Sequence, residues 1–159
     1  LKYDKLSLEE LKNVNSDFYQ SGLKNNWFSG LKNKIPLKKK GLLKTKAWQQ
    51  MNEEDGITIC TMRNPPWRNR INIDVYSYAL APSQELLKKY KNQEISWLDY
   101  RQVYSLQIRQ EQFLDDLIEV ARNTTITLYC CEPTSQKCHR RLIAEECLKR
   151  ERSLRLIIE

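Results

Sequence analysis

The chain is 159 residues long, which is enough for one compact domain that buries a sizeable hydrophobic core. This length and composition argue against a collagen-like chain, a small disulfide scaffold and a multidomain machine. The formal net charge of +7 comes from one segment, because residues 1–50 hold eleven Lys and four acidic residues, whereas residues 51–159 hold 16 basic and 16 acidic residues. The sequence thus separates a basic segment from a nearly neutral remainder.

The cysteines and the hydropathy pattern indicate the compartment. No run approaches the roughly 20 apolar residues that cross a bilayer, and the chain does not begin with the pattern of a secretion signal. The five cysteines form an odd set, which does not resemble the framework of a secreted disulfide-rich domain. They are Cys60, Cys130, Cys131, Cys138 and Cys147. We therefore expect a soluble, cytoplasmic protein with reduced thiols and no contact with a membrane.

The first third of the chain is basic and lacks a continuous structural pattern. Between residues 24 and 46 there are eight Lys and no acidic residue, and Gly30, Pro36 and Gly41 interrupt any long helix. We interpret residues 20–50 as a partly irregular basic arm or insertion that is helical in pieces.

Aromatic side chains are interleaved with these lysines. Trp27, Phe28 and Trp48 offer stacking faces, and the lysines neutralise phosphates, so the segment suits contact with a nucleic acid. The lysines that we expect to bind are Lys32, Lys34, Lys38, Lys39, Lys40, Lys44 and Lys46. The alternatives are a solubilising arm and docking to an acidic protein partner.

From Gly56 onward the pattern is that of a folded α/β domain. Short β-branched runs alternate with segments of helical periodicity, and proline pairs or capping residues separate them. The expected elements in chain order are a strand over 57–62, an extended segment over 71–76, a helix that begins at 82–83, a helix capped by Ser96 and Asp99, and an amphipathic helix over 111–122.

The clearest unit follows. Thr125–Cys130 is a β-branched run typical of a buried strand, 131–137 is a polar loop, about 138–152 is a helix, and 154–158 is a final strand. Strand, loop, helix and strand predict a βαβ crossover and hence parallel strands. We therefore predict a single compact α/β domain over 56–159 with a mostly parallel sheet flanked by helices, preceded by a lysine-rich segment over 1–55.

Reactive groups gather where the strand Thr125–Cys130 ends, the edge at which open α/β sheets hold their sites. They are Cys130, Cys131, Glu132, Lys137, Cys138, His139 and Arg140. One interpretation is a nucleophilic Cys activated by Lys137 or Arg140, with His139, the only imidazole of the chain, as proton carrier. A second is an anion site for phosphates at which no bond is broken. A third is that Cys130 is a buried core thiol, His139 a helix residue with its hydrogen bonds satisfied, and Arg140 and Arg141 a solvated face that pairs with Glu145.

Zinc binding is a further alternative for this cluster. Cys130, Cys138 and His139 are ligand types that zinc prefers, and Cys60 or Glu132 would complete a set of four. Adjacent residues of a helix point to different faces, however, and no two cysteines have a two-residue spacing. We therefore assign no metal and no cofactor to the site at this point.

The same residues resemble a known family. Thr127–Glu132 followed by Cys138–Glu146 is similar to the hallmark of the domain of unknown function 488 family, in which a strand ends in Cys, Glu follows two positions on, and a Cys-His-Arg triplet opens a helix. Asn64–Trp67 and Leu80–Lys91 are similar to the shorter bacterial and phage branch of that family. The resemblance covers roughly Gly56–Ile158.

The resemblance implies a compact α/β fold and no settled activity. It places the first strand near Phe18–Ser21, and it makes Cys131 a variable position, so that the nucleophile is Cys130 or Cys138. The functional cluster that it implies is Cys130, Glu132, Cys138, His139 and Arg140, with Pro65, Pro66 and Trp67 as a second wall of the pocket.

We therefore expect a protein that binds or acts on a nucleic acid or a nucleotide. As a thiol-dependent hydrolase or transferase, it would use His139 as general acid or base and Glu132 to orient Arg140 or His139. The anion-binding groups would be Lys137, Arg140 and Arg141. As a binding protein, it would hold an anion at a site built on a Glu132–Arg140 pair. The remaining alternative is a module that docks an acidic partner, with a structural or zinc-binding Cys-His cluster.

Overall fold

A computed structural model describes residues 41–65 and 71–159. Five strands form one sheet in the order β3-β2-β4-β1-β5, and every strand pair is parallel. The strands are β1 (Leu42–Ala47), β2 (Ile57–Cys60), β3 (Val75–Tyr76), β4 (Thr125–Cys130) and β5 (Leu156–Ile158). The predicted α/β class with a parallel sheet is confirmed.

Strand β1 corrects the interpretation of the basic arm. Residues 42–47 were expected to belong to an irregular segment, but they form a strand between β4 and β5, near the middle of the sheet. Successive side chains of a strand point to opposite faces of the sheet, so Leu43 packs into the core while Lys44 and Lys46 point to the other face. The first strand expected near residues 18–21, and Lys32, Lys34, Lys38, Lys39 and Lys40, lie outside the described residues.

Four helices are described, and two of them begin directly after the predicted capping residues. They are α3 (Gln84–Lys91), α4 (Trp97–Arg109), α5 (Phe113–Ala121) and α6 (His139–Arg150). Ser83 caps α3, and Ser96 with Asp99 forms the capping box of α4. In the described part of the chain, none of these helices combines the length and the apolar character needed to span a bilayer.

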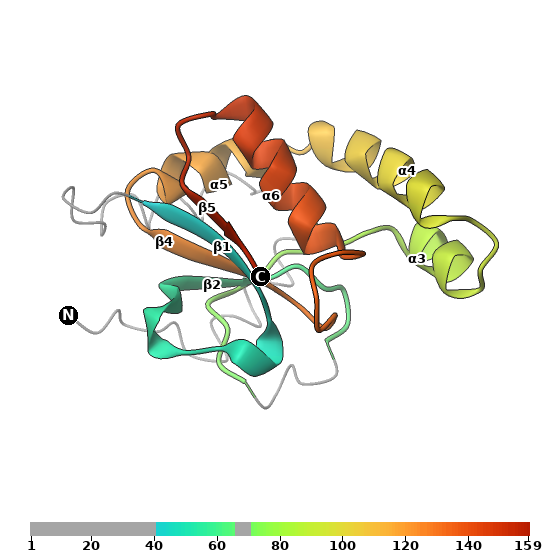
Figure 1. Cartoon of the computed structure of the whole chain (residues 1–159), viewed down its shortest axis with the longest axis horizontal. Helices are drawn as coiled ribbons and strands as arrows, with labels where there is room; N and C mark the ends of the chain where they lie inside the picture. The colour runs from blue at the N-terminus through green and yellow to red at the C-terminus, as the bar shows by residue number, and fades with distance from the viewer. Residues whose placement is uncertain (1–40, 66–70) are drawn as a thin grey trace, which may run out of the picture.

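The two faces of the sheet have different coverings. Helices α5 and α6 lie on one side of the strands, whereas the short 3-10 helices η1 (Trp48–Gln50) and η2 (Glu53–Asp55) lie on the other (Figure 1). The helical side holds the main core, in which Leu43, Ile59 and Leu128 of the strands are fully buried against helix residues such as Phe113 and Ile143. The other side holds a smaller cluster with a polar neighbourhood.

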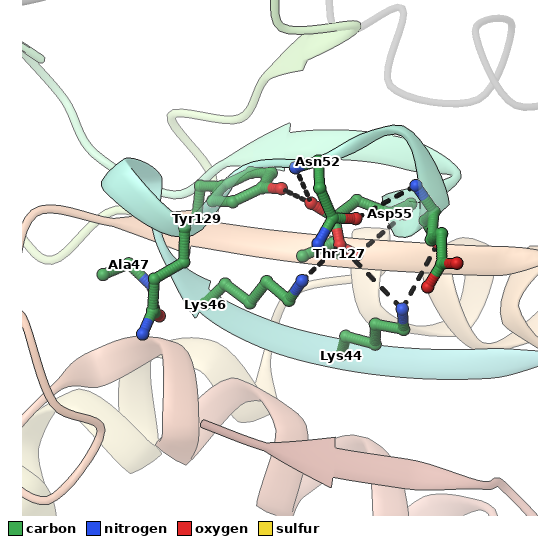
Figure 2. Close-up of polar contacts among 9 residues, drawn as sticks. Lys44, Lys46, Ala47, Asn52, Asp55, Thr127 and Tyr129 are labelled. Carbon is green, nitrogen blue, oxygen red and sulfur yellow. Dashed lines mark hydrogen bonds and ion pairs between the residues drawn. The ribbon is translucent and has the colours of Figure 1, made fainter.

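A buried ion-pair network occupies this second side (Figure 2). Asp55 is fully buried, and its Oδ1 lies 2.7 Å from the ammonium nitrogen of Lys46, which is itself 6 % exposed. The Tyr129 hydroxyl donates a short hydrogen bond to Asp55 Oδ2, and Asn52 N–H donates to the same oxygen at 2.8 Å. Lys44 lies farther away, at 3.9 Å from Oδ1. Lys46 is therefore neutralised inside the protein, and its predicted place on an exposed phosphate-binding arm is wrong.

Gly56 is required where this network meets the sheet. Its φ is +64°, a conformation that side chains with a Cβ rarely adopt, and an added Cβ would lie 2.2 Å from the Thr125 carbonyl oxygen. The close approach lets η2 end directly at β2. The glycine thus fixes Asp55 beside β1 and β4.

Candidate thiol-imidazole site

Three predicted functional side chains converge at the carboxyl edge of the sheet. Cys130 ends β4, and Cys138 and His139 stand at the start of α6. The two sulfur atoms and a ring nitrogen of His139 all lie within 4.8 Å of one another, and all three residues are buried. This is the location at which parallel α/β sheets place their sites. The predicted convergence of these residues is therefore present in the structure.

The hydrogen bonds of His139 define its protonation pattern. Its Nε2 lies 2.8 Å from the Thr61 carbonyl oxygen, which only accepts, so Nε2 carries a proton and donates. Thr61 Oγ1 lies 3.1 Å from the same nitrogen and donates its own proton to the Tyr129 carbonyl oxygen. The other ring nitrogen, Nδ1, lies 3.8 Å from Cys130 Sγ. A neutral His139 therefore presents its free lone pair to the Cys130 sulfur.

Cys138 is the N-cap residue of α6 rather than a residue within it. Its backbone is extended, with φ −129° and ψ 138°, and the first helical residue is His139. The argument that adjacent helix residues point to different faces therefore does not apply to this pair. The sulfur lies at the positive end of a 12-residue helix, where a negative charge is stabilised.

Arg140 lies beside Cys138 and is completely buried. Its Nη1 donates to the Glu132 main-chain carbonyl oxygen at 2.6 Å and to Cys138 Sγ at 3.5 Å, and its Nη2 donates to a Glu159 main-chain oxygen at 3.1 Å. Within the described residues its Nε has no hydrogen-bond partner. The expected pair with the Glu132 carboxylate is therefore wrong, because Arg140 holds the carbonyl of that residue. The Cys138 sulfur is a partner of Arg140 that carries a negative charge when it is ionised.

The electrostatics of Cys138 favour the thiolate. A hydrogen bond from Cys130 lowers the pKa of Cys138, burial raises it, and the charge of Arg140 lowers it further, so that the net pKa lies below the usual value of a thiol. Burial lowers the pKa of His139, but charge on the Cys130 sulfur and hydrogen bonds to Cys130 and to the Thr61 carbonyl raise it by more. Relative to the free groups, the lowered pKa of Cys138 favours its thiolate and the raised pKa of His139 favours its imidazolium.

The loop between β4 and α6 is open to solvent. Glu132 and Lys137 are exposed, and the Glu132 carboxylate accepts a weak hydrogen bond from Cys131 Sγ at 3.7 Å. The hydrogen bond with Cys130, followed by burial, raises the pKa of Cys131 well above its usual value. Arg141 pairs with Glu145 at 2.7 Å, as the surface ion-pair interpretation expected, but the solvated position expected for Arg140 is wrong because that side chain is fully buried. Of the loop residues, Lys137 therefore offers a cation to an incoming anion.

Other predicted residues stand apart from the cluster. Cys60 belongs to the apolar group on the opposite face of the sheet, with Ile73 and Tyr129. Pro65 is buried, whereas Pro66 and Trp67 lie outside the described residues, so the second wall is described only at its first proline. Neither Cys60 nor Glu132 is among the donor atoms that lie within 4.8 Å of one another.

Sequence reasoning missed a row of aromatic rings that ends at His139. The Tyr104 ring lies edge-on to the imidazole with centroids 5.6 Å apart, and Tyr100 stacks on Tyr104 at 6.0 Å. Trp97 stacks on Tyr100 at 5.2 Å. The Tyr104 hydroxyl donates to the Leu80 carbonyl oxygen at 2.6 Å, which fixes the ring. The three- and four-residue spacing of these aromatics along α4 was the available signal.

Thr61 was the other residue missed. It follows β2 directly and therefore lies at the same carboxyl edge as Cys130, because β2 and β4 are parallel neighbours. The place of Thr61 beside Cys130 could be inferred only from the order of the strands in the sheet.

A known protein-family model matches a part of the chain that contains Thr61, Cys130, Cys138, His139 and Arg140. Residues 43–151 match the model DUF488-N3a, described as the active DUF488-N3 subclade. The chain belongs to this family. The match begins within β1, upstream of the range over which the resemblance was expected, and it confirms that the family's domain includes that strand. No curated protein and no solved structure matches the chain.

Proposed function

We propose that this DUF488-N3a protein is a thiol-dependent enzyme that works in the cytoplasm on a phosphate-bearing ligand, a nucleotide or a nucleic acid, with Cys138 as its nucleophile. One observation carries the proposal: Cys138 Sγ lies between the buried guanidinium of Arg140 and the hydrogen-bonded pair of Cys130 and His139. An activated thiol requires a nucleophile, a group that carries the proton and a group that orients this proton carrier. Here these would be Cys138, the Cys130–His139 pair and the Thr61 carbonyl.

Cys138 is a better nucleophile than Cys130 because of its neighbours. A buried guanidinium needs a nearby negative charge, and the Cys138 sulfur at 3.5 Å supplies it when ionised. The Cys130 sulfur instead faces the imidazole at 3.8 Å, where it shares a proton with Nδ1. We therefore assign the thiolate to Cys138 and the transferable proton to the Cys130–His139 pair.

The chemical step then balances as follows. The Cys138 thiolate attacks phosphorus and forms an S–P bond, while the P–O bond to the leaving group breaks. The leaving oxygen takes the proton held between Cys130 Sγ and His139 Nδ1. Water next attacks phosphorus, the S–P bond breaks to restore the thiolate, and the proton of the water returns to the Cys130–His139 pair.

The ligand class is inferred from charge. Lys137 is exposed on the loop that leads into the N-terminus of α6, and helix N-termini favour anions. Residues 1–40, which exclude the two lysines beside Asp55, hold nine Lys and four acidic residues, and this surplus would add a non-specific attraction for a polyanion. These observations favour a nucleotide phosphate or a nucleic-acid backbone over a neutral substrate.

The proposed function is tested with the full chain and a panel of nucleoside mono-, di- and triphosphates and short DNA and RNA strands. We expect release of a phosphate or cleavage product and a phosphoryl adduct on Cys138 in acid-quenched samples analysed by mass spectrometry. C138S should abolish both, and C131S, a neighbouring thiol outside the cluster, should retain both. The proposal fails if C138S keeps full turnover or if no member of the panel is consumed.

The nucleic-acid part has a separate test. Affinity for DNA or RNA should fall steeply as salt rises, and substitution of Lys32, Lys34 and Lys38–Lys40 by Gln should reduce the slope of that dependence. Absence of binding at low salt, or binding only to an acidic protein partner, would remove nucleic acid as the ligand.

A further inference from the structure

We propose that Cys130, Cys138 and His139 also bind one zinc ion, which reversibly closes the thiol site. The metal site stands on the geometry of the three side chains alone. Only its consequence, that zinc inhibits the enzyme, rests on the proposed function. The inference therefore survives even if the ligand or the reaction proposed above is wrong.

The donor atoms have the spacing that a tetrahedral zinc site needs. With Zn–S near 2.3 Å and Zn–N near 2.0 Å, tetrahedral geometry places neighbouring donor atoms roughly 3.5–3.8 Å apart. Cys130 Sγ and His139 Nδ1 are 3.8 Å apart, and all three donor atoms lie within 4.8 Å of one another. Small side-chain rotations suffice to bring the three atoms around one ion.

The imidazole is already oriented for a metal. Ligating histidines usually donate their second ring N–H to a carbonyl or carboxylate, which fixes the ring and leaves the other nitrogen free for the ion. In this structure Nε2 donates to the Thr61 carbonyl oxygen at 2.8 Å, and Nδ1 faces Cys130 Sγ at 3.8 Å. Cys138 contributes from the N-cap position, where its extended backbone directs it toward Cys130 rather than along the helix.

Charge balance in the buried site also favours a divalent ion. Two adjacent thiolates repel each other when no cation lies between them, and a divalent ion bound to both sulfur atoms removes that repulsion. Zinc binds thiolates, so its binding releases thiol protons to solvent, and two thiolates then neutralise the two charges of the ion. Arg140 remains beside Cys138 at 3.5 Å, so the second charge on sulfur is shared between metal and guanidinium. Zinc and not a hard ion such as magnesium is expected, because two of three ligands are sulfur.

The consequence for the thiol follows from the shared atoms. A sulfur atom bound to zinc has no free lone pair of comparable reactivity for attack on phosphorus. The loop residues Cys131 and Glu132 lie outside the ligand cluster, so three protein ligands leave one position for water. Zinc should thus protect Cys138 and withdraw it from catalysis until a chelator or a competing protein removes the ion.

The test uses the full chain made metal-free with a chelator. Native mass spectrometry should show one zinc per chain, and cobalt(II) should give the sulfur-to-metal absorption and the intense visible bands of a tetrahedral site. C130S, C138S and H139Q should each lower the affinity for zinc. The loss should exceed the roughly 10–100-fold loss of affinity that follows removal of a group outside the ligand shell. C131S is the matched control and should bind zinc like the wild type.

The outcomes separate this inference from the proposed function. No stoichiometric zinc, an octahedral cobalt spectrum, or binding unchanged in C138S or H139Q would overturn the metal site, whether or not the metal-free protein forms an adduct. Zinc binding that depends on all three residues supports it, even if no phosphate ligand is consumed. Alkylation of Cys138 should be suppressed in the zinc-loaded protein and restored by chelator, and equal alkylation in both forms would overturn the closure of the site.

Discussion

His139 donates its Nε2 proton to the carbonyl oxygen of Thr61 at 2.8 Å, and this contact determines what the imidazole offers to its other neighbour. Because the carbonyl only accepts, the neutral ring must keep its free lone pair on Nδ1, 3.8 Å from Cys130 Sγ. Thr61, at the end of β2, thereby sets the tautomer of His139, the first residue of α6. Both the thiol chemistry and the zinc site that we propose depend on it.

The tautomer itself is directly measurable because His139 is the only histidine in the chain. The ¹⁵N NMR spectrum of the neutral ring should show the Nε2–H form, with Nδ1 unprotonated. T61A keeps the carbonyl and removes the hydroxyl, so the same tautomer should persist in this variant. An Nδ1–H form in the wild type would contradict the hydrogen bond on which the site is built.

The network around Asp55 should contribute strongly to stability. D55N removes the charge that faces Lys46 in a buried environment, and breaking one partner of a buried pair costs about 3–5 kcal/mol. E85Q breaks the solvent-exposed Glu85–Lys89 pair of α3 and should cost far less, because water and salt screen this pair. Urea unfolding of the two variants measures both losses of stability. Similar losses would show that the buried Asp55 network contributes no more to stability than an exposed ion pair.

The same network should make the protein sensitive to acid. Burial raises the pKa of Asp55, but hydrogen bonds from Lys46 and Tyr129 lower it by more, so the folded pKa lies below the unfolded value near 3.9. Stability from this group is therefore complete above that value and is lost as pH falls through the folded pKa. The difference in unfolding free energy between wild type and D55N should be constant from neutral pH to about 5 and should shrink below about 4. A difference that stays constant down to pH 3 would contradict this assignment.

Two positions with positive φ should respond to substitution in opposite directions. Gly56 at +64° has no space for a Cβ, so G56A should destabilise the fold by more than about 1–2 kcal/mol. Gln93 at +60° follows the C-cap of α3, a position that favours glycine, so Q93G should stabilise by about 0.5–1 kcal/mol. Thermal unfolding measures both, and the same sign in the two variants would show that backbone strain does not dominate.

The sequence predicted the second half of the fold well because local signals there agree. The β-branched run Thr125–Cys130 coincides with β4, and the Ser96–Asp99 capping box starts α4 where expected. Strand β1 was missed because two lysines in six residues are atypical of a central parallel strand. The counter-charge that permits Lys46 to be buried, Asp55, comes from a separate short helix, and a pairing of this kind is visible only in three dimensions.

The candidate site shows the same division. The Cys-His-Arg triplet and Cys130 were identified from their order along the chain, and their convergence is present in the structure. The role expected of Glu132 depended on its carboxylate, whereas Arg140 binds its carbonyl oxygen, and sequence does not distinguish the two. Thr61 depends on the order of the strands, so its place in the site could not be predicted. The aromatic row leaves a signal in the spacing of its residues along α4, but its contact with His139 depends on the packing of α4 against α6.

The ionisation of Cys138 is the central claim, and thiolate absorbance in the ultraviolet measures it directly. Metal-free wild-type protein and C138S are titrated from acid to alkaline pH, with C131S as the control. Because the hydrogen bond from Cys130 and the charge of Arg140 hold the pKa of Cys138 below the usual thiol value, the wild type should show thiolate absorbance at a pH below the usual thiol range, and this absorbance should be lost in C138S and retained in C131S. Superimposable titration curves for wild type and C138S below that range would contradict the account.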